Sequence, residues 1–146
     1  MSKNEHFDRL IRLFQSAPIN KGIFKNSSID LAEGKAEYLF KVEQSFFHGA
    51  NALHGAIYFK LLDDAAYFAA ATLVTDQFLV TKSYQVQFVR PVHLERLIAK
   101  GSVIEMNDLE IIAGSEIFNE QGKLVAKGEG VFVRSKKFLS ELEGYA

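Results

Sequence analysis

His54, Gly55 and Asp63 are the residues of this sequence best suited to chemistry, and all three belong to one apolar stretch. We expect a helix to begin at Gly55, where the first N–H groups lack partners within the helix and carry the positive end of its dipole. A glycine there also lets a ligand approach the backbone closely. A His-Gly pair before a helix is ordinarily a cap or a tight turn. Its functional interpretation is an oxyanion hole, which stabilises the charge that develops on a carbonyl oxygen in acyl transfer.

Asp63 lies near the middle of a stretch, from Gly55 to Val74, that is apolar on most of its helical circumference. Aspartate has poor helix propensity and is costly to desolvate, so it needs a partner, a wet cavity or a function at that place. If Asp63 faces a pocket, burial raises the pKa of its carboxyl and makes it a better proton acceptor. Asp64 points about a hundred degrees away around the helix, and we expect it to be structural.

Gly55 and Asp63 are too far apart to act on one carbonyl within a single chain. They are eight residues apart in the sequence. At about 1.5 Å of rise per residue they are separated by roughly 12 Å along the helix axis. If both are catalytic, the Asp63 that serves a given oxyanion hole comes from a second subunit. The spacing therefore predicts an obligate homodimer with two equivalent sites.

The elements that position these residues can be read from hydrophobic periodicity. A short amphipathic helix is expected within residues 1–17, with Ser2 and Glu5 as a capping box. From Gly22 to Val42 apolar residues recur at every second position, which indicates β-strands. We expect Ala32–Lys35 to be the turn between two such strands. The buried helix follows.

Four further strands are expected after the buried helix, at Phe78–Val89, His93–Ile104, Leu109–Phe118 and Leu124–Arg134. Residues 106–108 and 119–122 are hairpin loops between the last three. Consecutive hairpin-connected strands after one long helix predict an α+β fold, with an antiparallel sheet curled around the helix. We expect one domain over residues 1–146, with a C-terminal tail from residue 135.

Composition excludes several classes of function. The formal net charge of −1 gives no overall field that would attract nucleic acid or an anionic membrane. The apolar run Leu53–Val74 is interrupted by Lys60, Asp63 and Asp64 and is not a membrane span. There is no cysteine, and the four histidines lack metal-ligand spacing, so no metal or cofactor is expected. With no recognisable secretion signal, a cytoplasmic location is expected.

The motifs together, from Phe46 to Arg134, resemble the PaaI-type branch of the hotdog-fold thioesterases. The resemblance rests on the order and spacing of short segments: Leu53-His54-Gly55-Ala56, Asp63 nine residues after His54, Thr81, Val86–Pro91, Asn119–Ala126 and Phe132-Val133.

This resemblance implies a hotdog fold and metal-free hydrolysis of acyl-CoA thioesters. It implies homodimers that join two sheets edge to edge and pair into homotetramers. Asp63 takes the place of the general base or nucleophile and Gly55 that of the carbonyl-polarising N–H. His54 takes the place of the histidine at the helix entrance, and Thr81 that of a hydroxyl that positions water.

Two positions depart from the family pattern. Ala56 replaces the second glycine of the usual His-Gly-Gly, next to the expected substrate carbonyl. His48 stands where the family has an Asn or Gln that orients substrate or water. Asn51 lies nearby and is a candidate substitute, and His48 itself is able to hydrogen-bond a carbonyl or water.

Basic and aromatic residues supply candidates for substrate binding. Four basic residues are candidates to hold the phosphates of CoA: Arg90, Arg134, Lys136 and Lys137. Six aromatic residues are candidates to line an acyl channel that suits a medium-chain or aromatic acyl group: Phe46, Phe47, Tyr58, Phe59, Tyr67 and Phe68.

Two other functions fit the same residues. One is a hotdog hydratase or dehydratase on acyl thioesters, with His48 or His54 as the base and Asp63 as its partner. The other is a non-catalytic module that binds acyl-CoA in the same pocket. Release of free thiol, or its absence, distinguishes both from a thioesterase.

Overall fold

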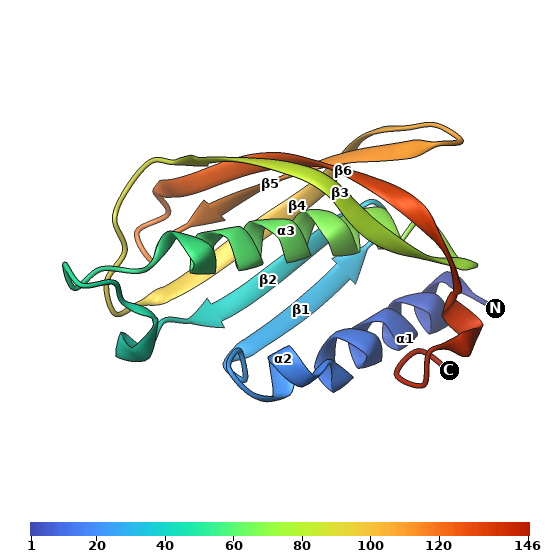
Figure 1. Ribbon diagram of the computed structural model, residues 1–146, viewed down its shortest axis with the longest axis horizontal. Helices are drawn as coiled ribbons and strands as arrows, with labels where there is room; N and C mark the ends of the chain where they lie inside the picture. Colours follow the sequence, from blue (N-terminus) through green and yellow to red (C-terminus); the bar gives the residue numbers. More distant parts are fainter.

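One antiparallel sheet wraps around a long helix in the computed structural model, which describes residues 1–146 (Figure 1). The helices are α1 (Lys3–Ser16), α2 (Pro18–Lys21) and α3 (Gly55–Ala71), with short 3-10 turns at Gln44–Phe46 and Leu139–Glu141. The strands are β1 (Ser27–Ala32), β2 (Lys35–Lys41), β3 (Gln77–Phe88), β4 (Arg96–Met106), β5 (Glu110–Phe118) and β6 (Leu124–Phe138). The predicted α+β architecture is confirmed.

The strands lie in the order β1-β2-β4-β5-β6-β3, and all neighbours are antiparallel. The prediction that hairpins connect all the strands after the long helix is therefore wrong for β3, which pairs with β6 and not with β4. The segment between β3 and β4 contains Pro91 and crosses the start of α3, where the Leu53 N–H donates to the Val92 carbonyl at 2.9 Å. This crossing carries the chain to the far side of the sheet, so β4 pairs with β2.

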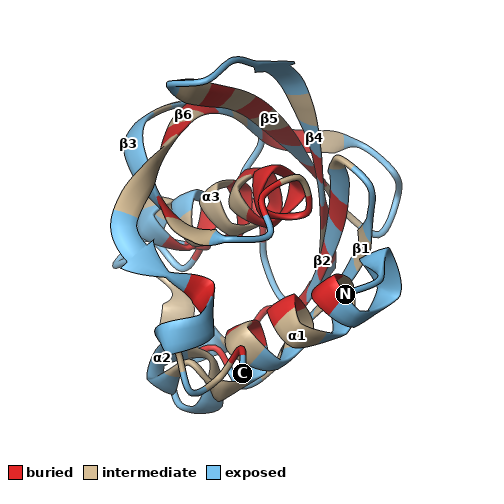
Figure 2. Ribbon diagram, turned by 90° about the vertical axis from the view of Figure 1, so that its right-hand side faces the viewer, coloured by how far each residue is buried: buried red, intermediate tan, exposed pale blue.

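Helix α3 is surrounded by protein, as its apolar circumference predicted. Figure 2 shows the sheet curling around α3 and α1 closing the open side. Small side chains let the helix approach the sheet, and four alanines of α3 are fully buried: Ala65, Ala66, Ala69 and Ala70. A Cβ added at Gly101 of β4 would lie 2.1 Å from the Ala65 carbonyl oxygen, so helix and strand backbones are in direct contact.

Half of the predicted capping box is present at the N-terminal helix: the Ser2 side chain accepts a hydrogen bond from the Glu5 N–H at 3.2 Å, whereas the Glu5 side chain does not bond back to the Ser2 N–H. The apolar face of this helix buries Leu10 and Phe14 against the open side of the sheet. The Phe14 ring meets Phe68 of α3 edge-on, with centroids 5.6 Å apart. The short helix α2 follows directly and was not predicted from the sequence.

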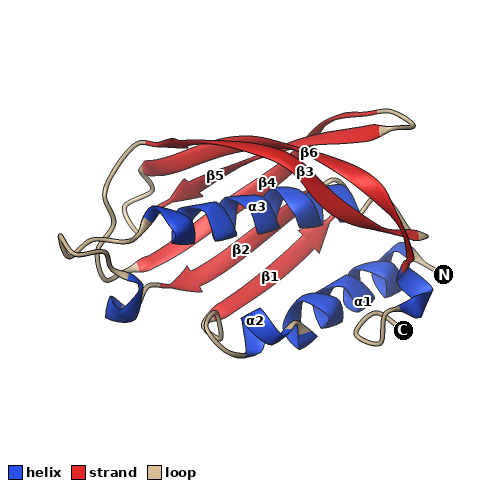
Figure 3. Cartoon of the chain, in the orientation of Figure 1, coloured by secondary structure: helices blue, strands red, loops and turns tan.

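Strand β6 extends beyond its predicted end at Arg134 to Phe138, which pairs with Gln77 of β3 (Figure 3). The segment assigned to a tail from residue 135 therefore begins as strand and only then turns back toward α1. The predicted turns at Ala32–Lys35 and at residues 119–122 are confirmed, with Gly34 at φ 70° and Gly122 at φ 75°. None of the helices has the length and apolar character needed to span a membrane.

Substitution of Gly101 tests the contact between helix and sheet. We expect Gly101→Ala to lower the free energy of unfolding by about 3 kcal/mol, because the added methyl group overlaps helix backbone that cannot rotate away. Gly49→Ala is the matched control, since a Cβ there has no neighbour within 4 Å. Urea unfolding of both variants measures the difference, and equal stabilities would contradict the contact.

Candidate active site

The turn of α3 that carries Asp63 is tied to the sheet by buried hydroxyl groups. The Ser115 hydroxyl of β5 donates to the Leu62 carbonyl at 2.7 Å and lies 2.6 Å from the Tyr84 hydroxyl of β3. One turn later, the Tyr67 hydroxyl donates to the Leu79 carbonyl at 2.6 Å. These bonds fix the rotation of α3, so that the side chain of Asp63 points toward β3.

Asp63 accepts a hydrogen bond at Oδ1 from the Thr81 hydroxyl of β3, at 2.9 Å. Burial raises the pKa of the Asp63 carboxyl from 3.8 to about 6, because the charged form loses its hydration. The Thr81 hydrogen bond and the Lys60 charge oppose this shift, and the Asp64 charge adds to it. The result is a carboxylate poised to accept a proton near neutral pH.

Asp64 forms a partly buried ion pair with Lys60, one helical turn earlier. The Lys60 ammonium also donates to Asn20 Oδ1 at 2.8 Å and to the Tyr38 hydroxyl at 3.2 Å. Three aromatic rings surround it, with centroids 4.7 Å (Phe24), 5.1 Å (Tyr38) and 5.5 Å (Phe14) from Nζ. This pairing gives Asp64 a structural partner, whereas Asp63 has only the Thr81 hydroxyl.

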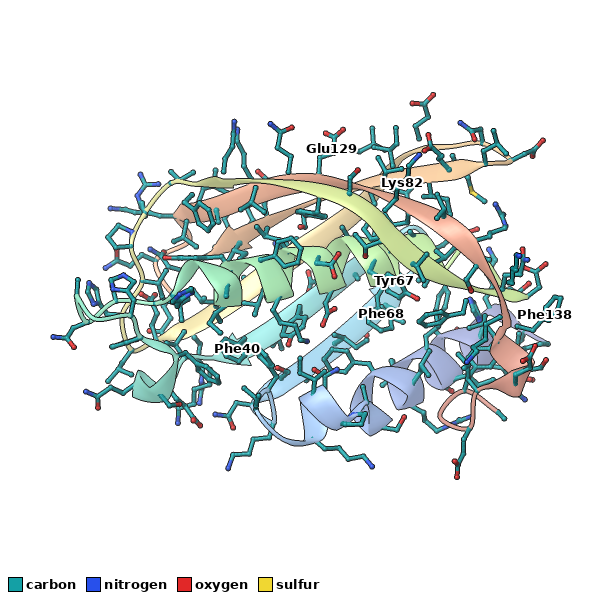
Figure 4. All side chains as sticks on the ribbon, viewed as in Figure 1. Phe40, Tyr67, Phe68, Lys82, Glu129 and Phe138 are labelled. Carbon is teal, nitrogen blue, oxygen red and sulfur yellow. The ribbon has the colours of Figure 1, made fainter.

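A cavity of about 660 Å³ adjoins Asp63, between α3, the α1–α2 junction, the start of β3 and residues 141–144. Figure 4 shows Tyr67 and Phe68, two predicted channel residues, on the side of α3 that faces α1. Asp63, Asp64 and Thr81 line the same cavity. Sequence reasoning missed the walls formed by α1 and residues 141–144, because nothing local in those segments signals that they meet.

The start of α3 combines a cap with an unpaired donor. The Nδ1 atom of His54 accepts a hydrogen bond from the Ala56 N–H at 2.9 Å, so His54 is the N-cap of the helix. The Gly55 N–H has no hydrogen-bond partner within the chain. The Phe88 ring lies next to Gly55, at 3.3 Å from where a Cβ would be. The His54 cap thus pairs the Ala56 N–H and leaves the Gly55 N–H available to a ligand.

The loop before α3 separates His48 and Asn51 from Asp63. His48 is exposed, and its Nδ1 accepts from the Ala50 N–H at 3.0 Å. Asn51 adopts the left-handed conformation, with φ 64°, and its carbonyl accepts from His93 Nδ1 at 3.2 Å. His48 lines a smaller pocket of about 260 Å³ near the start of α3, together with Ala52, Leu53, Tyr58, Phe88, Val89, Arg90 and Pro91.

Four of the six predicted channel residues lie outside the cavity beside Asp63. Phe46 stacks on Phe24, with ring centroids 5.5 Å apart, and Tyr58 lines the smaller pocket near the start of α3. Phe59 is 42% exposed, and its ring meets Tyr84 edge-on at 5.7 Å. Phe47 packs against His93, with ring centroids 6.4 Å apart. None of these four residues lines the cavity beside Asp63.

The predicted phosphate ligands are not brought together within one chain. Arg90 donates to the Leu124 carbonyl at 2.6 Å, at the start of β6. Arg134, near the other end of β6, donates to the Asp108 carbonyl at 3.3 Å, and the exposed Lys136 follows it. The long strand β6 holds Arg90 and Arg134 at opposite ends of the sheet.

Within one chain, Gly55 and Asp63 remain on different turns of α3, as the helical spacing predicted. Neither His48 nor His54 hydrogen-bonds Asp63, whose only side-chain partner is Thr81. The His-Asp pair needed for a hydratase is therefore not formed inside a single chain.

The thioesterase superfamily model matches residues 50–126, more than half of the chain. The chain belongs to the thioesterase superfamily. The matched segment contains Gly55, Asp63 and Thr81, and membership places this thioesterase among enzymes that hydrolyse thioesters. A protein of Saccharolobus solfataricus, provisionally described as an esterase, is 26% identical over 102 residues, which are 70% of this chain and 73% of the relative.

Solved structures share the fold of this thioesterase. The PaaI protein of the E. coli phenylacetic acid degradation operon superposes with a TM-score of 0.83 at 22% identity, covering 93% of this chain and 97% of that one. Zebra fish thioesterase superfamily member 2 superposes with a TM-score of 0.78 at 18% identity. The match covers 92% of this chain and 99% of that one. At these identities the likeness shows the fold, and the predicted hotdog fold is confirmed.

The raised pKa of Asp63 predicts a stability effect with a definite sign. Because the folded-state pKa is about 6 and the unfolded value 3.8, the folded chain binds more protons in this window, so its stability falls as pH rises through it. Asp63→Asn removes this partly buried charge. We expect this variant to be more stable than wild type above about pH 6, by the order of 2 kcal/mol, and to lose that advantage below about pH 4. Urea unfolding at several pH values tests this, and a variant less stable than wild type at pH 8 would contradict it.

Proposed function

We propose that this thioesterase hydrolyses an acyl-CoA thioester to the free acid and CoA, with Asp63 as the general base. The observation that carries the proposal is the desolvated Asp63 carboxyl, held by Thr81 at the edge of a cavity large enough for an acyl group. Thioesterase membership supports the reaction class, and the resemblance to PaaI-type sequences supports CoA as the carrier.

The proposed reaction begins with water bound near Asp63. Thr81 occupies Oδ1, so Oδ2 accepts a proton as the water oxygen bonds to the thioester carbon. The carbonyl electrons move onto oxygen, where the Gly55 N–H stabilises the oxyanion. When the carbonyl re-forms, the C–S bond breaks, and the thiolate leaves and takes the proton from Asp63. Direct attack by the carboxylate would use the same placement and form an anhydride that water then cleaves.

The proposed site needs a second copy of the chain, because Gly55 and Asp63 of one chain cannot reach the same carbonyl. The edge strand β3 supports this assembly. It leaves Val80 39% exposed, and Phe88 and Val89 at its end are 58% and 46% exposed. Long apolar edges that remain unpaired invite pairing with another chain. We propose a homodimer joined along β3, and pairing into a homotetramer stays a prediction of the family resemblance.

We propose that CoA lies along the start of α3, where His48 and Arg90 share the smaller pocket. Arg90 is the candidate for a phosphate, since its guanidinium has donors beyond the one used by the Leu124 carbonyl. Arg134 and Lys136 would reach a CoA molecule only from the partner subunit. The absence of cysteine fits a reducing compartment, and we propose the cytoplasm.

Asp63→Asn is expected to lower kcat by a factor of at least about 100, because the amide cannot accept the proton. In the wild type, kcat/KM is expected to fall as pH drops below about 6, where the carboxyl becomes protonated. A free-thiol assay over a panel of acyl-CoA thioesters measures both effects.

Asp64→Asn is the matched control for the same assay. It leaves the Lys60 ammonium without its counter-charge, so we expect it to lower stability while kcat falls far less than in Asp63→Asn. Wild-type turnover in Asp63→Asn would contradict the role of Asp63. Binding of acyl-CoA without thiol release from any panel member would favour a non-catalytic binding module.

Gly55→Pro tests the proposed oxyanion donor. Gly55 is the first residue of α3, a position that tolerates proline, and His54 has the extended conformation, φ −67° and ψ 140°, that proline requires before it. The variant therefore removes the N–H while the helix persists, and we expect a loss of activity of about 100-fold or more. Gly55→Ala places a methyl group at the same point next to Phe88 but keeps the donor, so it is the control.

Mixing Gly55→Pro with Asp63→Asn subunits tests whether the site is shared. After unfolding and refolding together, each mixed dimer contains one site with both residues intact. We expect recovery of about a quarter of the wild-type activity if the subunits assort randomly. Absence of any recovery, in a mixture shown to contain mixed dimers, would contradict a shared site.

A further inference from the structure

Residues Leu139–Ala146, here called the C-terminal segment, are docked firmly on α1. The buried His6 ring lies between the Tyr145 hydroxyl, 2.8 Å from Nδ1, and the Ala71 carbonyl, 2.9 Å from Nε2. Because a carbonyl only accepts, Nε2 donates to Ala71 and Nδ1 accepts from Tyr145. Arg12 of α1 donates to the Tyr145 carbonyl at 3.2 Å. The side chains of Leu139 and Tyr145 are buried, so the segment is part of the folded core.

The C-terminal segment forms a wall of the cavity that contains Asp63. Leu142 and Gly144 line this wall, next to Leu13 of α1. Gly144 packs so closely that an added Cβ would lie 2.3 Å from Ser16 Oγ and 3.3 Å from Leu13 Cδ1. A methyl group at position 144 would have to turn the Ser16 hydroxyl aside, and a branched side chain needs still more room, so we expect valine there to push the segment away from α1 and open the cavity.

The charges around the cavity are mostly negative. Four carboxylates line it, from Asp63, Asp64, Glu141 and Glu143, and Lys60 is its only cation. The Lys60 ammonium already uses its three N–H donors on Asp64, Asn20 and Tyr38. A second anion entering the cavity would be repelled with no free cation to pair with it.

We propose that the C-terminal segment is the specificity wall of the acyl site: it ends the cavity at a fixed depth and admits an uncharged acyl group of medium length, while excluding one that ends in a carboxylate. This inference rests on the proposed thioesterase function, because it takes the acyl group to lie next to Asp63. The residues that set length are Leu142 and Gly144, together with Leu13, and those that set charge are Glu141 and Glu143.

The proposal predicts that kcat/KM depends on the length of the acyl chain and stops rising at one particular length. For straight-chain acyl-CoA thioesters from acetyl to palmitoyl, kcat/KM rises about fourfold per methylene while each added group is buried. The rise stops at the chain length that reaches the wall. Hexanoyl-CoA is preferred over adipoyl-CoA, which has the same carbon count with a terminal carboxylate, by at least about tenfold.

Two variants move the wall in opposite directions. Leu142→Trp fills the cavity, so the profile ends at a shorter acyl chain. Gly144→Val displaces the segment, so kcat/KM continues to rise for longer acyl chains than in the wild type. Ser140→Trp is the matched control for the bulky residue, because Ser140 is exposed and does not line the cavity. Acetyl-CoA turnover and the length profile of Ser140→Trp stay within about twofold of wild type, since Ser140 lies outside the cavity.

The charge part of the proposal has its own variant. Glu141→Gln with Glu143→Gln keeps the side-chain shapes and the hydrogen bond that Glu141 accepts from the Phe138 N–H. We expect it to raise adipoyl-CoA hydrolysis about tenfold or more relative to hexanoyl-CoA, while hexanoyl-CoA itself changes little.

These experiments distinguish failure of the specificity wall from failure of the proposed thioesterase function. If wild type releases thiol from the panel but Leu142→Trp and Gly144→Val both keep the wild-type length profile, the specificity wall is overturned and the thioesterase function stands. Equal rates for adipoyl-CoA and hexanoyl-CoA overturn the charge selection. If wild type releases no thiol from any substrate, both the function and the inference are overturned.

Discussion

The desolvation of Asp63 is the constraint on which this site depends. A carboxylate on a helix enclosed by protein raises the free energy of the folded state unless a function or a partner compensates. Asp63 receives one hydrogen bond, from Thr81, which holds its orientation without neutralising it. The second oxygen is left to a ligand or to water. A carboxylate kept in this incomplete state is a stronger base than one at the surface, with a pKa of about 6.

The ion pair between Asp64 and Lys60 shows how the cost of desolvating a carboxylate is offset on the same helix. Asp64 is paired with Lys60, and the ammonium is enclosed by aromatic rings and by Asn20 of α2. This network requires α1 and α2 to cover the open side of the sheet. The N-terminal helices therefore have two roles, since they complete the environment of Lys60 and form one side of the cavity. Adjacent aspartates thus differ in their partners, because Asp64 is paired with the Lys60 ammonium whereas Asp63 has only the Thr81 hydroxyl.

Local patterns predicted most of the elements, whereas long-range pairings had to come from the structure. The cap at Ser2, the start of α3 at Gly55 and the turn at Gly34 depend on residues near in sequence. The pairing of β3 with β6 depends on where the segment through Pro91 leads the chain, which periodicity does not encode.

The same distinction applies to the site. The resemblance named Asp63 and Thr81 separately as site residues, and the structure shows that they are in contact, whereas nothing in the sequence pointed to the wall formed by residues 141–144. Arg90 and Arg134 were grouped by charge alone, and the antiparallel course of β6 separates them. Sequence reasoning therefore proposed candidate residues for the chemistry, whereas the segments that enclose Asp63 came from the structure.

The most direct test of this account is the titration of the Asp63 carboxyl itself. Carbon-13 NMR of the protein labelled at aspartate Cγ, with Asp63→Asn to assign the resonance, reports that pKa without reference to any substrate. The account predicts a titration midpoint near pH 6. A midpoint near pH 4, the value of a hydrated aspartate, would show that the side chain is solvated and would contradict the central claim.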